Sequence, residues 1–455
     1  MAFLGRDYLL NSRSAKTLFE KIEKLPIVDA HNHADVKEIA ANGNYKNPWQ
    51  FLIGTDHYIW ALMRKCSIDE HYITGSAQPR EKWLKLAEVF PFMVGNPVYE
   101  WMHLELKRFL GIDALLDRST GEKIWEETDS LLKKPEYKPQ YLLDKLGVEV
   151  MCSSDDPVDL LDAHDRVNRD MGRIIVHPTW RADRIVKISS PDWPAYVRKL
   201  AERFDSRCSC LKDLSGILRR SHDYFAEHGC RASDHSMRVP FPCVAEEKQA
   251  DRIFRSVFAG DSVQAEERDI LADYIFSLLA GMDSEKNWVF QMHLGVVRDP
   301  RRSLFASFGP DAGCDVSDQS VDMLAPLREF LNRFDNRLKV VFYCLDFVYQ
   351  ATLATLSRSF GANVKLGAAW WFCDTPFGMK RQLEFISSVD LLYSFAGMVS
   401  DSRRILAYGS RFEMFRRVLS DVLGGMIEKG SMPEEIAFEL AERMSYSAPK
   451  DFFAL

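Results

Sequence analysis

Two histidines separated by a single residue are the strongest chemical signal in this chain. His31 and His33 stand at the end of a short apolar run that begins at Leu25. Successive side chains of a β-strand point to opposite faces, so residues two positions apart point the same way. His31 and His33 can therefore bind one metal ion together, because imidazole nitrogen is a common ligand of zinc.

Further short apolar runs follow, and each ends on polar or ionisable residues. This pattern is typical of buried strands that carry a site at their ends. Asp234, His293 and Asp401 each lie at the end of such a run. The eight expected strands cover residues 25–33, 148–152, 174–180, 230–233, 288–292, 338–345, 364–369 and 392–400.

Segments with helical periodicity, such as 412–429, separate most of these runs. Eight strands that alternate with helices predict an α/β fold of the (β/α)8 TIM-barrel type. In such a barrel, the carboxyl ends of all strands meet at one mouth. We therefore expect the two histidines and the three later strand-end residues to converge there.

Two intervals between the expected strands are too long for plain crossovers. About 115 residues separate the first two strands and about 50 separate the fourth from the fifth, whereas a crossover needs only a dozen or more. Residues 81–90 and 99–110 have helical patterns. We expect mostly helical insertions after strands 1 and 4, the first over approximately 35–145, which would cover the mouth. Since no linker or repeat interrupts residues 1–455, one elaborated barrel domain is expected.

The composition indicates a globular enzyme with a small-molecule partner. The chain has 46% hydrophobic and 27% charged residues and a formal net charge of -7. This acidic balance argues against nucleic acid or an anionic membrane as a partner. The charged N-terminus, the lack of a long apolar run and nine scattered cysteines without a Cys-x-x-Cys pair predict a cytoplasmic protein with reduced thiols. A homo-oligomer is the expected assembly.

Distinctive sequence motifs along almost the whole chain resemble those of a known protein family. They are PIVDAHNH from Pro26, GTDHYIWALMR from Gly54, YITG from Tyr72, GNPVYEWMHLELKRF from Gly95, SSDDPVD from Ser153, PTWR from Pro178, GCRASDH from Gly229, QMHLG from Gln291, LFASFGPDAGCD from Leu304, AAWWF from Ala368 and GMVSDSR from Gly397. In these motifs, the chain resembles the uronate isomerase (glucuronate isomerase) family of the amidohydrolase superfamily. It departs from the family pattern at Ala34, Ala182, Phe347 and Cys373, which concern loop geometry.

The resemblance implies an aldose–ketose isomerase of hexuronate catabolism. Its reactions would be D-glucuronate to D-fructuronate and D-galacturonate to D-tagaturonate. Such chemistry needs a group that moves a proton between C2 and C1, an electrophile that polarises the carbonyl, and a clamp for the carboxylate. The chain offers candidates for each of these functions.

The expected metal ligands are His31, His33 and Asp401. The first and last strands are neighbours in a closed barrel, and zinc suits two imidazoles with a carboxylate, with manganese or another divalent ion as the alternative. The fourth strand ends in Ala-Ser-Asp-His, without the lysine that bridges two metals in many related hydrolases. One metal ion is therefore expected, with His293 as a further ligand or as a hydrogen-bond partner of the sugar.

The resemblance assigns proton transfer to Asp401, with Tyr58 and Arg403 as partners. A carboxylate bound to metal is a poor base unless one oxygen is free, so Tyr58 is the alternative base. Asp234 and His293 are placed to help open the sugar ring.

The expected substrate contacts are Arg181, His57 and Trp370. A guanidinium can hold the carboxylate of a uronate with two parallel hydrogen bonds. Two other functions remain open at this point: a one-metal hydrolase or deaminase on the same barrel, and a sugar-acid-binding protein without turnover.

Overall fold

The computed structural model describes residues 2–238, 240 and 246–455. Its strands form a parallel sheet in the order β1-β2-β3, a parallel sheet in the order β4-β5-β8-β9, and a short antiparallel pair, β6 and β7. The protein is thus an α/β fold built on parallel sheets. The strands are β1 (Ile27–Asp29), β2 (Val148–Cys152), β3 (Ile175–His177), β4 (Ala232–Met237), β5 (Val289–Leu294), β6 (Val296–Val297), β7 (Val316–Ser317), β8 (Lys339–Cys344) and β9 (Val364–Leu366).

The first seven expected strands each overlap an observed strand of the two parallel sheets. The expectation that the first strand includes His31 and His33 is wrong, because β1 ends at Asp29 and both histidines lie in the irregular segment that follows it. The run 148–152 is predicted with both ends correct, because its apolar residues stop where Ser153 begins. The fourth strand extends further than expected, to Met237, and so contains Asp234. The strand β5 is buried along its whole length, as expected for a strand covered on both faces.

Two sets of backbone contacts join the parallel sheets. Trp180, just after β3, forms isolated parallel bridges to Asp155 on one side and to Ser233 of β4 on the other. On the other side of the fold, the amide of Ala396 donates to the carbonyl of Leu366 in β9 over 2.9 Å. The segment 396–402 also contacts the chain after β1, since the amide of Asp401 donates to the carbonyl of His31 over 3.2 Å.

The prediction of a strand over 392–400 is wrong. Residues Leu392–Ser394 form a 3-10 helix and residues 395–400 are irregular. Gly397 has a φ of 106°, and a Cβ there would lie 2.8 Å from Cδ of Pro449. Asp401 has a φ of 49°. These left-handed conformations are incompatible with a regular strand, although the apolar side chains still face the core.

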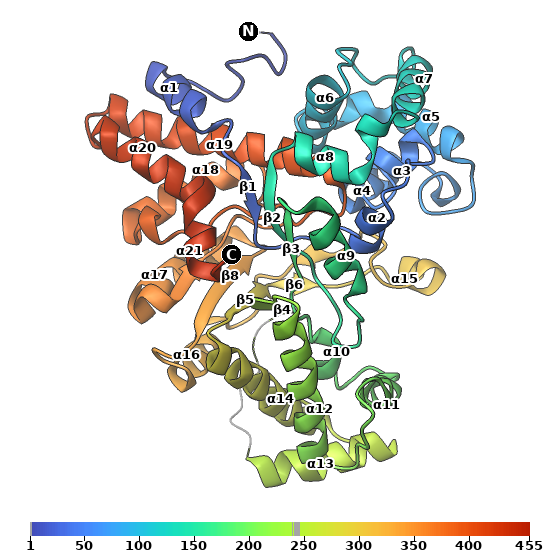
Figure 1. Ribbon diagram of the computed structural model, residues 1–455, viewed down its shortest axis with the longest axis vertical. Coiled ribbons are helices and arrows are strands. Elements are labelled where there is room, and N and C mark those ends of the chain that lie inside the picture. The colour runs from blue at the N-terminus through green and yellow to red at the C-terminus, as the bar shows by residue number, and fades with distance from the viewer. Residues whose placement is uncertain (1, 239, 241–245) are drawn as a thin grey trace.

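The interval between β1 and β2 is helical, as predicted. Figure 1 shows these helices gathered in the upper right part of the molecule. The helix α6 begins with Pro97 at its first position, where the missing amide proton costs nothing, and Asn96 caps it. The helices are α2 (Val36–Ala41), α3 (Pro48–Leu52), α4 (His57–Lys65), α5 (Pro79–Val89), α6 (Pro97–Phe109), α7 (Gly121–Leu132) and α8 (Pro139–Lys145).

In the described part of the interval between β4 and β5 lie two helices, α13 (Glu247–Ala259) and α14 (Ala265–Lys286), in agreement with the second expected insertion. The long helix α19 packs against α1, α6 and α18. The helices outside the first insertion are α1 (Arg13–Ile22), α9 (Asp162–Met171), α10 (Asp183–Val186), α11 (Trp193–Arg203), α12 (Leu211–Glu227), α13 (Glu247–Ala259), α14 (Ala265–Lys286), α15 (Arg302–Phe308), α16 (Leu324–Arg333), α17 (Gln350–Phe360), α18 (Pro376–Val389), α19 (Ile405–Glu428), α20 (Glu434–Glu442) and α21 (Ala448–Phe453).

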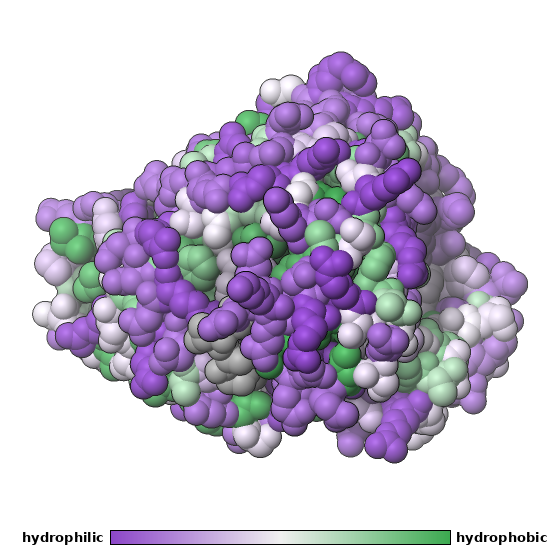
Figure 2. All heavy atoms as spheres, turned by 90° about the horizontal axis from the view of Figure 1, so that it is seen from below, coloured by the Kyte–Doolittle hydropathy of each residue, from purple (hydrophilic) through white to green (hydrophobic). Residues whose placement is uncertain are grey.

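The surface seen from below is covered mainly by hydrophilic side chains, with hydrophobic ones in small groups among them (Figure 2). The apolar core runs through the strands and the inner faces of the helices, and it includes Val28, Phe290 and Phe342. Within the described residues, no helix is both long and apolar enough to cross a membrane.

Candidate active site

A cavity of about 510 Å³ lies beyond the carboxyl ends of the strands. This volume is typical of small-molecule sites, which span about 300–1,000 Å³. Strand ends and following loops contribute one part of the wall, and α4 of the first insertion contributes another. All expected site residues except Asp234 line the cavity: His31, His33, His57, Tyr58, Arg181, His293, Trp370, Asp401 and Arg403.

His31, His33 and Asp401 form the centre of this site. The oxygen Oδ1 of Asp401 lies 3.2 Å from Nε2 of His31 and 3.2 Å from Nε2 of His33. Burial acts to raise the pKa of Asp401, but the two histidines hold it well below its ordinary value. Burial lowers the pKa of His33 to about 4. At neutral pH the carboxylate is therefore ionised and His33 is neutral, which are the forms that bind a metal ion.

The donor geometry fits a divalent ion. Tetrahedral coordination with bonds of about 2.1 Å places ligand atoms roughly 3.4 Å apart. The ligand atoms of His31, His33 and Asp401 all lie within 4.8 Å of one another, and so do those of His31, Asp234 and His293. Of these two groups, only the first joins two imidazoles of one chain segment to a carboxylate of the segment 396–402.

Asp234 lies beside this group and is completely buried. Its oxygens lie 3.6 Å from Nδ1 of His31, 2.8 Å from Nδ1 of His293 and 2.8 Å from Nη1 of Arg181. Burial acts to raise the pKa of Asp234, but Arg181 and the two histidines hold it well below its ordinary value. Asp234 is thus a buried carboxylate whose charge is balanced inside the site.

His293 presents an unused nitrogen. Burial, with His31 nearby, lowers its pKa to about 4, so the ring is neutral at pH 7. Its Nε2 is buried and has no hydrogen-bond partner among the described residues. A buried polar atom without a partner costs free energy, so this nitrogen marks a position for a ligand atom.

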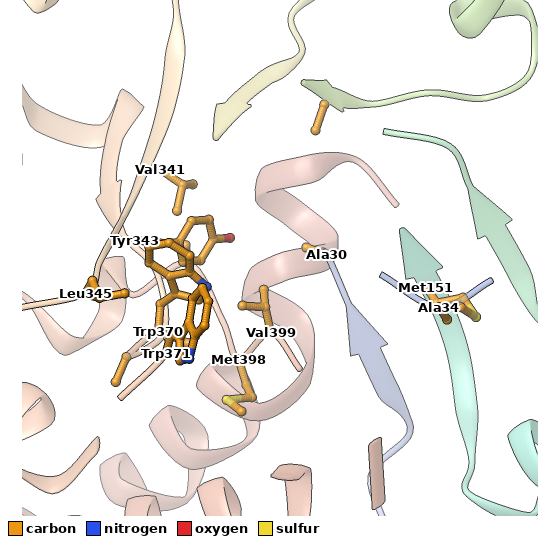
Figure 3. Packing of buried hydrophobic residues seen from close by; sticks show 14 of the residues in the cluster. Ala30, Ala34, Met151, Val341, Tyr343, Leu345, Trp370, Trp371, Met398 and Val399 are labelled. Carbon is orange, nitrogen blue, oxygen red and sulfur yellow. The ribbon is translucent and has the colours of Figure 1, made fainter. Parts of the chain in front are cut away.

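Aromatic rings form the wall next to His293. The ring of His293 stacks on Tyr343 with centroids 4.6 Å apart, and it lies 4.7 Å from the ring of Trp370. Figure 3 shows Trp370 and Trp371 grouped with Tyr343. The indole nitrogen of Trp370 donates to Oδ2 of Asp401 over 2.8 Å. Trp370 therefore contacts the central carboxylate directly, a contact that the sequence did not predict.

Tyr58 enters the site from α4 and contacts Asp374. Its hydroxyl donates to both carboxylate oxygens over 3.0 Å, and Arg411 forms an ion pair with the same carboxylate. Burial, together with the charge of Asp374, raises the pKa of Tyr58 well above its ordinary value. Tyr58 is therefore protonated at neutral pH.

The charged rim of the cavity contains Arg403, His57 and Asp311. Nη2 of Arg403 lies 3.9 Å from a carboxylate oxygen of Asp311. Burial and the charge of Arg403 lower the pKa of His57 to about 4. Arg403 is about one-third exposed, so its guanidinium can reach a ligand in the cavity.

Arg181, the expected carboxylate clamp, is already bound to two carboxylates. Its Nε donates to Asp183 over 3.0 Å and its Nη1 donates to Asp234 over 2.8 Å. Two of its five N–H donors are used in this way, so three remain for a ligand. The two carboxylates fix the orientation of the guanidinium while it lines the cavity.

The sequence interpretation missed several charged residues of this site. Arg298 donates to Asp315 over 2.7 Å and lies 5.3 Å from the ring of Trp371. Asp311 and Asp315 stand within the motif LFASFGPDAGCD, and Asp374 follows AAWWF by one residue. The sequence could have pointed to these positions, because they are acidic residues in or next to distinctive motifs. Their cationic partners come from distant segments, so the sequence does not show the ion pairs.

Comparisons with known proteins agree over the whole chain. The family model described as glucuronate isomerase matches residues 1–453. The chain is 46% identical to uronate isomerase from Thermotoga sp. (strain RQ2) over 451 residues, which are 99% of each protein.

Solved structures give the same result. The crystal structure of uronate isomerase from Thermotoga maritima has a TM-score of 0.97 at 45% identity and covers 100% of both chains. That of glucuronate isomerase from Caulobacter crescentus has a TM-score of 0.91 at 25% identity, over 99% of this chain and 97% of the other. The full-length match, together with the convergence of His31, His33 and Asp401, leads to one conclusion: this chain belongs to the glucuronate isomerase family.

Proposed function

We propose that this protein is a uronate isomerase that converts D-glucuronate to D-fructuronate and D-galacturonate to D-tagaturonate. The observation that carries this proposal is the family match over residues 1–453 in a chain whose His31, His33 and Asp401 meet at one cavity. The cavity also has cationic side chains for a carboxylate and a neutral imidazole for a hydroxyl group. An acid sugar in its open-chain form matches this set of contacts.

The fold that positions the site is inferred to be a single (β/α)8 barrel domain over residues 1–455. The bridges of Trp180 and the hydrogen bond from Ala396 to Leu366 support closure, because they lie at the two places where the parallel sheets meet. The segment 396–402 then occupies the position of the eighth strand.

One divalent metal ion, with zinc as the expected metal, would be held by His31, His33 and Asp401. When bound, such an ion polarises the carbonyl of the substrate as a Lewis acid. The chain itself fixes Asp401 through Oδ1 toward the histidines and through Oδ2 toward Trp370. In the proposed reaction, this carboxylate would lie next to C1 and C2 of the sugar.

The pKa directions favour Asp401 over Tyr58 as the residue that carries the proton between C2 and C1. Asp401 is ionised at neutral pH and can accept a proton, whereas Tyr58 keeps its proton. Tyr58 carries a single hydroxyl proton, which it donates to Asp374, so it would donate to an oxygen of the substrate by exchanging that hydrogen bond when the sugar binds. Arg403 is placed to stabilise negative charge that develops on that oxygen.

Asp234 and His293 would open the sugar ring by taking the proton of the C1 hydroxyl group and returning it to the ring oxygen, which becomes the C5 hydroxyl group as its bond to C1 breaks. His293 is neutral and has a free buried nitrogen, and Asp234 orients its other nitrogen. Arg181, assisted by His57, would hold the carboxylate of the uronate, and Trp370 would pack against the sugar.

Incubation of the protein with D-glucuronate, followed by NMR of the products in deuterated water, tests the proposal. Formation of D-fructuronate is expected, and deuterium at C1 would support proton transfer through an enediol. Parallel incubations with amide, ester and purine substrates test the hydrolase and deaminase alternative. Hydrolysis without isomerisation would overturn the proposal, as would binding of glucuronate without turnover. A homo-oligomeric assembly and a cytoplasmic location stay predictions.

A further inference from the structure

A second cavity, of about 390 Å³, lies at the opposite end of β1 from the active site. Ile27, the first residue of β1, lines it, whereas His31 beyond the other end of this strand lines the active-site cavity. Phe412 of α19 and Phe109 at the end of α6 form its apolar walls. Among the described residues, the two cavities share no lining residue, so the second one is separate from the active site.

Positive charge dominates this cavity. Only Glu23 and Glu413 oppose its cations among the described lining residues. Glu413 is shared, since Arg417 donates to it over 2.9 Å and Arg108 lies 3.3 Å away. The cations are Arg6, Arg108, Lys145, Arg416 and Arg417. The cavity therefore carries more positive than negative groups.

Arg416 is the least compensated of these cations. Its side chain is buried, with a residue exposure of 4%, and it donates to the backbone carbonyls of Glu23 over 3.1 Å and Pro26 over 2.8 Å. No carboxylate within the described chain pairs with it, and its Nε has no hydrogen-bond partner. Burial lowers the pKa of Arg416 to about 10. A buried charge without a counterion is costly, and an anion from solution would remove that cost.

Lys145, the last residue of α8, stands at the exposed rim of the same cavity. Its Nζ lies 3.3 Å from the carbonyl oxygen of Phe109, and it has no ion-pair partner among the described residues. The flexible side chain of Lys145 can place its ammonium against a ligand that the more deeply buried guanidinium of Arg416 binds. Arg416 and Lys145 thus offer charge to the cavity from two separate helices.

We propose that this cavity binds a small anion through a phosphate or carboxylate group, with Arg416 and Lys145 as its anchoring cations. A guanidinium binds both groups with parallel hydrogen bonds. The volume falls in the range of small-molecule sites, about 300–1,000 Å³, so it can hold more than a single inorganic ion. The apolar walls would contact the carbon skeleton of an organic anion.

Such an anion would stabilise the folded protein. It would bind between α8 and α19, which contribute residues from sequence positions far apart. A ligand that binds only the folded state raises the free energy of unfolding according to its concentration and its dissociation constant. The midpoint of thermal unfolding should therefore rise with the concentration of the anion.

Isothermal titration calorimetry and thermal unfolding with inorganic phosphate, glycerol 3-phosphate and citrate test the proposal. Sodium chloride at matched ionic strength controls for screening. The variants are Lys145→Gln, Arg416→Gln and, as a matched control for the loss of one positive charge, Lys199→Gln on the exposed face of α11. Figure 1 places α11 at the other end of the molecule from α1 and α19.

We expect saturable binding of at least one anion to the unmodified protein and to Lys199→Gln. Lys145→Gln should weaken it about tenfold, the value of one charge-assisted hydrogen bond, while kcat/KM for glucuronate stays unchanged. The ranking of the three anions shows whether phosphate or carboxylate is preferred. Equal affinity in Lys145→Gln and the unmodified protein would overturn the proposal, as would binding that saturating glucuronate abolishes. Lys145→Gln decides the test if Arg416→Gln does not fold.

Discussion

The hydroxyl of Tyr58 lies 3.0 Å from both carboxylate oxygens of Asp374, a residue 316 positions later in the chain. Tyr58 belongs to the first insertion, and Asp374 belongs to the loop after β9. Arg411 on α19 forms an ion pair with the same carboxylate. One buried carboxylate therefore fixes an insertion residue against the strand ends, and this contact sets where the tyrosine lies in the cavity.

If Asp374 positions Tyr58, the two residues should act as a unit. Tyr58→Phe is expected to lower kcat about a hundredfold, because a positioned proton donor contributes at least that much. Asp374→Asn should lower kcat by about tenfold with a smaller change in KM, and the double variant should be no slower than Tyr58→Phe. Steady-state kinetics of the three variants checks this. Multiplicative effects would show that Asp374 affects kcat independently of Tyr58.

Loss of the paired histidines should remove the metal ion. The double variant His31→Asn with His33→Asn leaves Asp401 as the single remaining residue of the three expected ligands. The metal content of the dialysed protein is therefore expected to fall to background. Elemental analysis by mass spectrometry measures it, with His222→Asn as a matched control. His222 is a buried histidine that lies 2.9 Å from Asp283, outside the cavity. Unchanged metal content in the double variant would assign the ion to other ligands.

Arg181→Met should reduce the preference for acid sugars. The loss of a charge-assisted contact of two hydrogen bonds is worth on the order of 3 kcal/mol, or about a hundredfold in kcat/KM for glucuronate. Turnover of glucose, which lacks the carboxylate, should change much less. Circular dichroism confirms folding, because Asp234 and Asp183 lose a partner in this variant. Undiminished turnover of glucuronate would move the clamp to Arg403 or His57.

Lys365 on β9 provides a test of stability against pH. Its side chain is buried next to the ring of Phe452, 4.4 Å from the ring centroid, and burial lowers its pKa to about 8. At pH 7 the folded protein holds a poorly solvated ammonium. Lys365→Met should therefore raise the free energy of unfolding by about 1–2 kcal/mol, a value reduced by the solvent that still reaches the ammonium.

The sign of the pH effect follows from the same lysine. Between its folded pKa of about 8 and its ordinary value of 10.5, the unfolded chain binds more protons than the folded one. The stability of the unmodified protein relative to Lys365→Met should rise with pH across this window. Thermal unfolding of both proteins between pH 7 and pH 10.5 measures the difference. A constant difference over this range would contradict a buried, titrating lysine.

The strands could be predicted from the sequence where apolar runs stop at the strand end, as at Val148–Cys152. The fourth strand could not be placed as well. Its charged residue Asp234 looks like the end of a run, but the strand continues because Arg181 balances this charge from a neighbouring segment. The irregular segment before Asp401 was missed for the opposite reason. Its apolar composition suits a strand, whereas the backbone conformation of Gly397 interrupts one.

The candidate site likewise has features that the sequence predicts and features that only the packing of the fold creates. The spacing of His31 and His33 is local and therefore visible in the sequence. The pairing of Asp374 with Arg411 depends on packing between α19 and the loop after β9, which no local pattern encodes. The use of Trp370 as a donor to Asp401 also depends on the fold, because the sequence shows only an aromatic residue at a strand end.

The irregular segment 396–402 also bears on the local opening of the protein. Few backbone hydrogen bonds join it to β9 and to the chain after β1, so its amide protons should exchange with solvent earlier than those of β5. A divalent ion bound by Asp401, His31 and His33 would link the segment 396–402 to the chain after β1. Metal loading should then slow hydrogen exchange at these amides selectively, so the proposed ion would also keep this part of the fold closed.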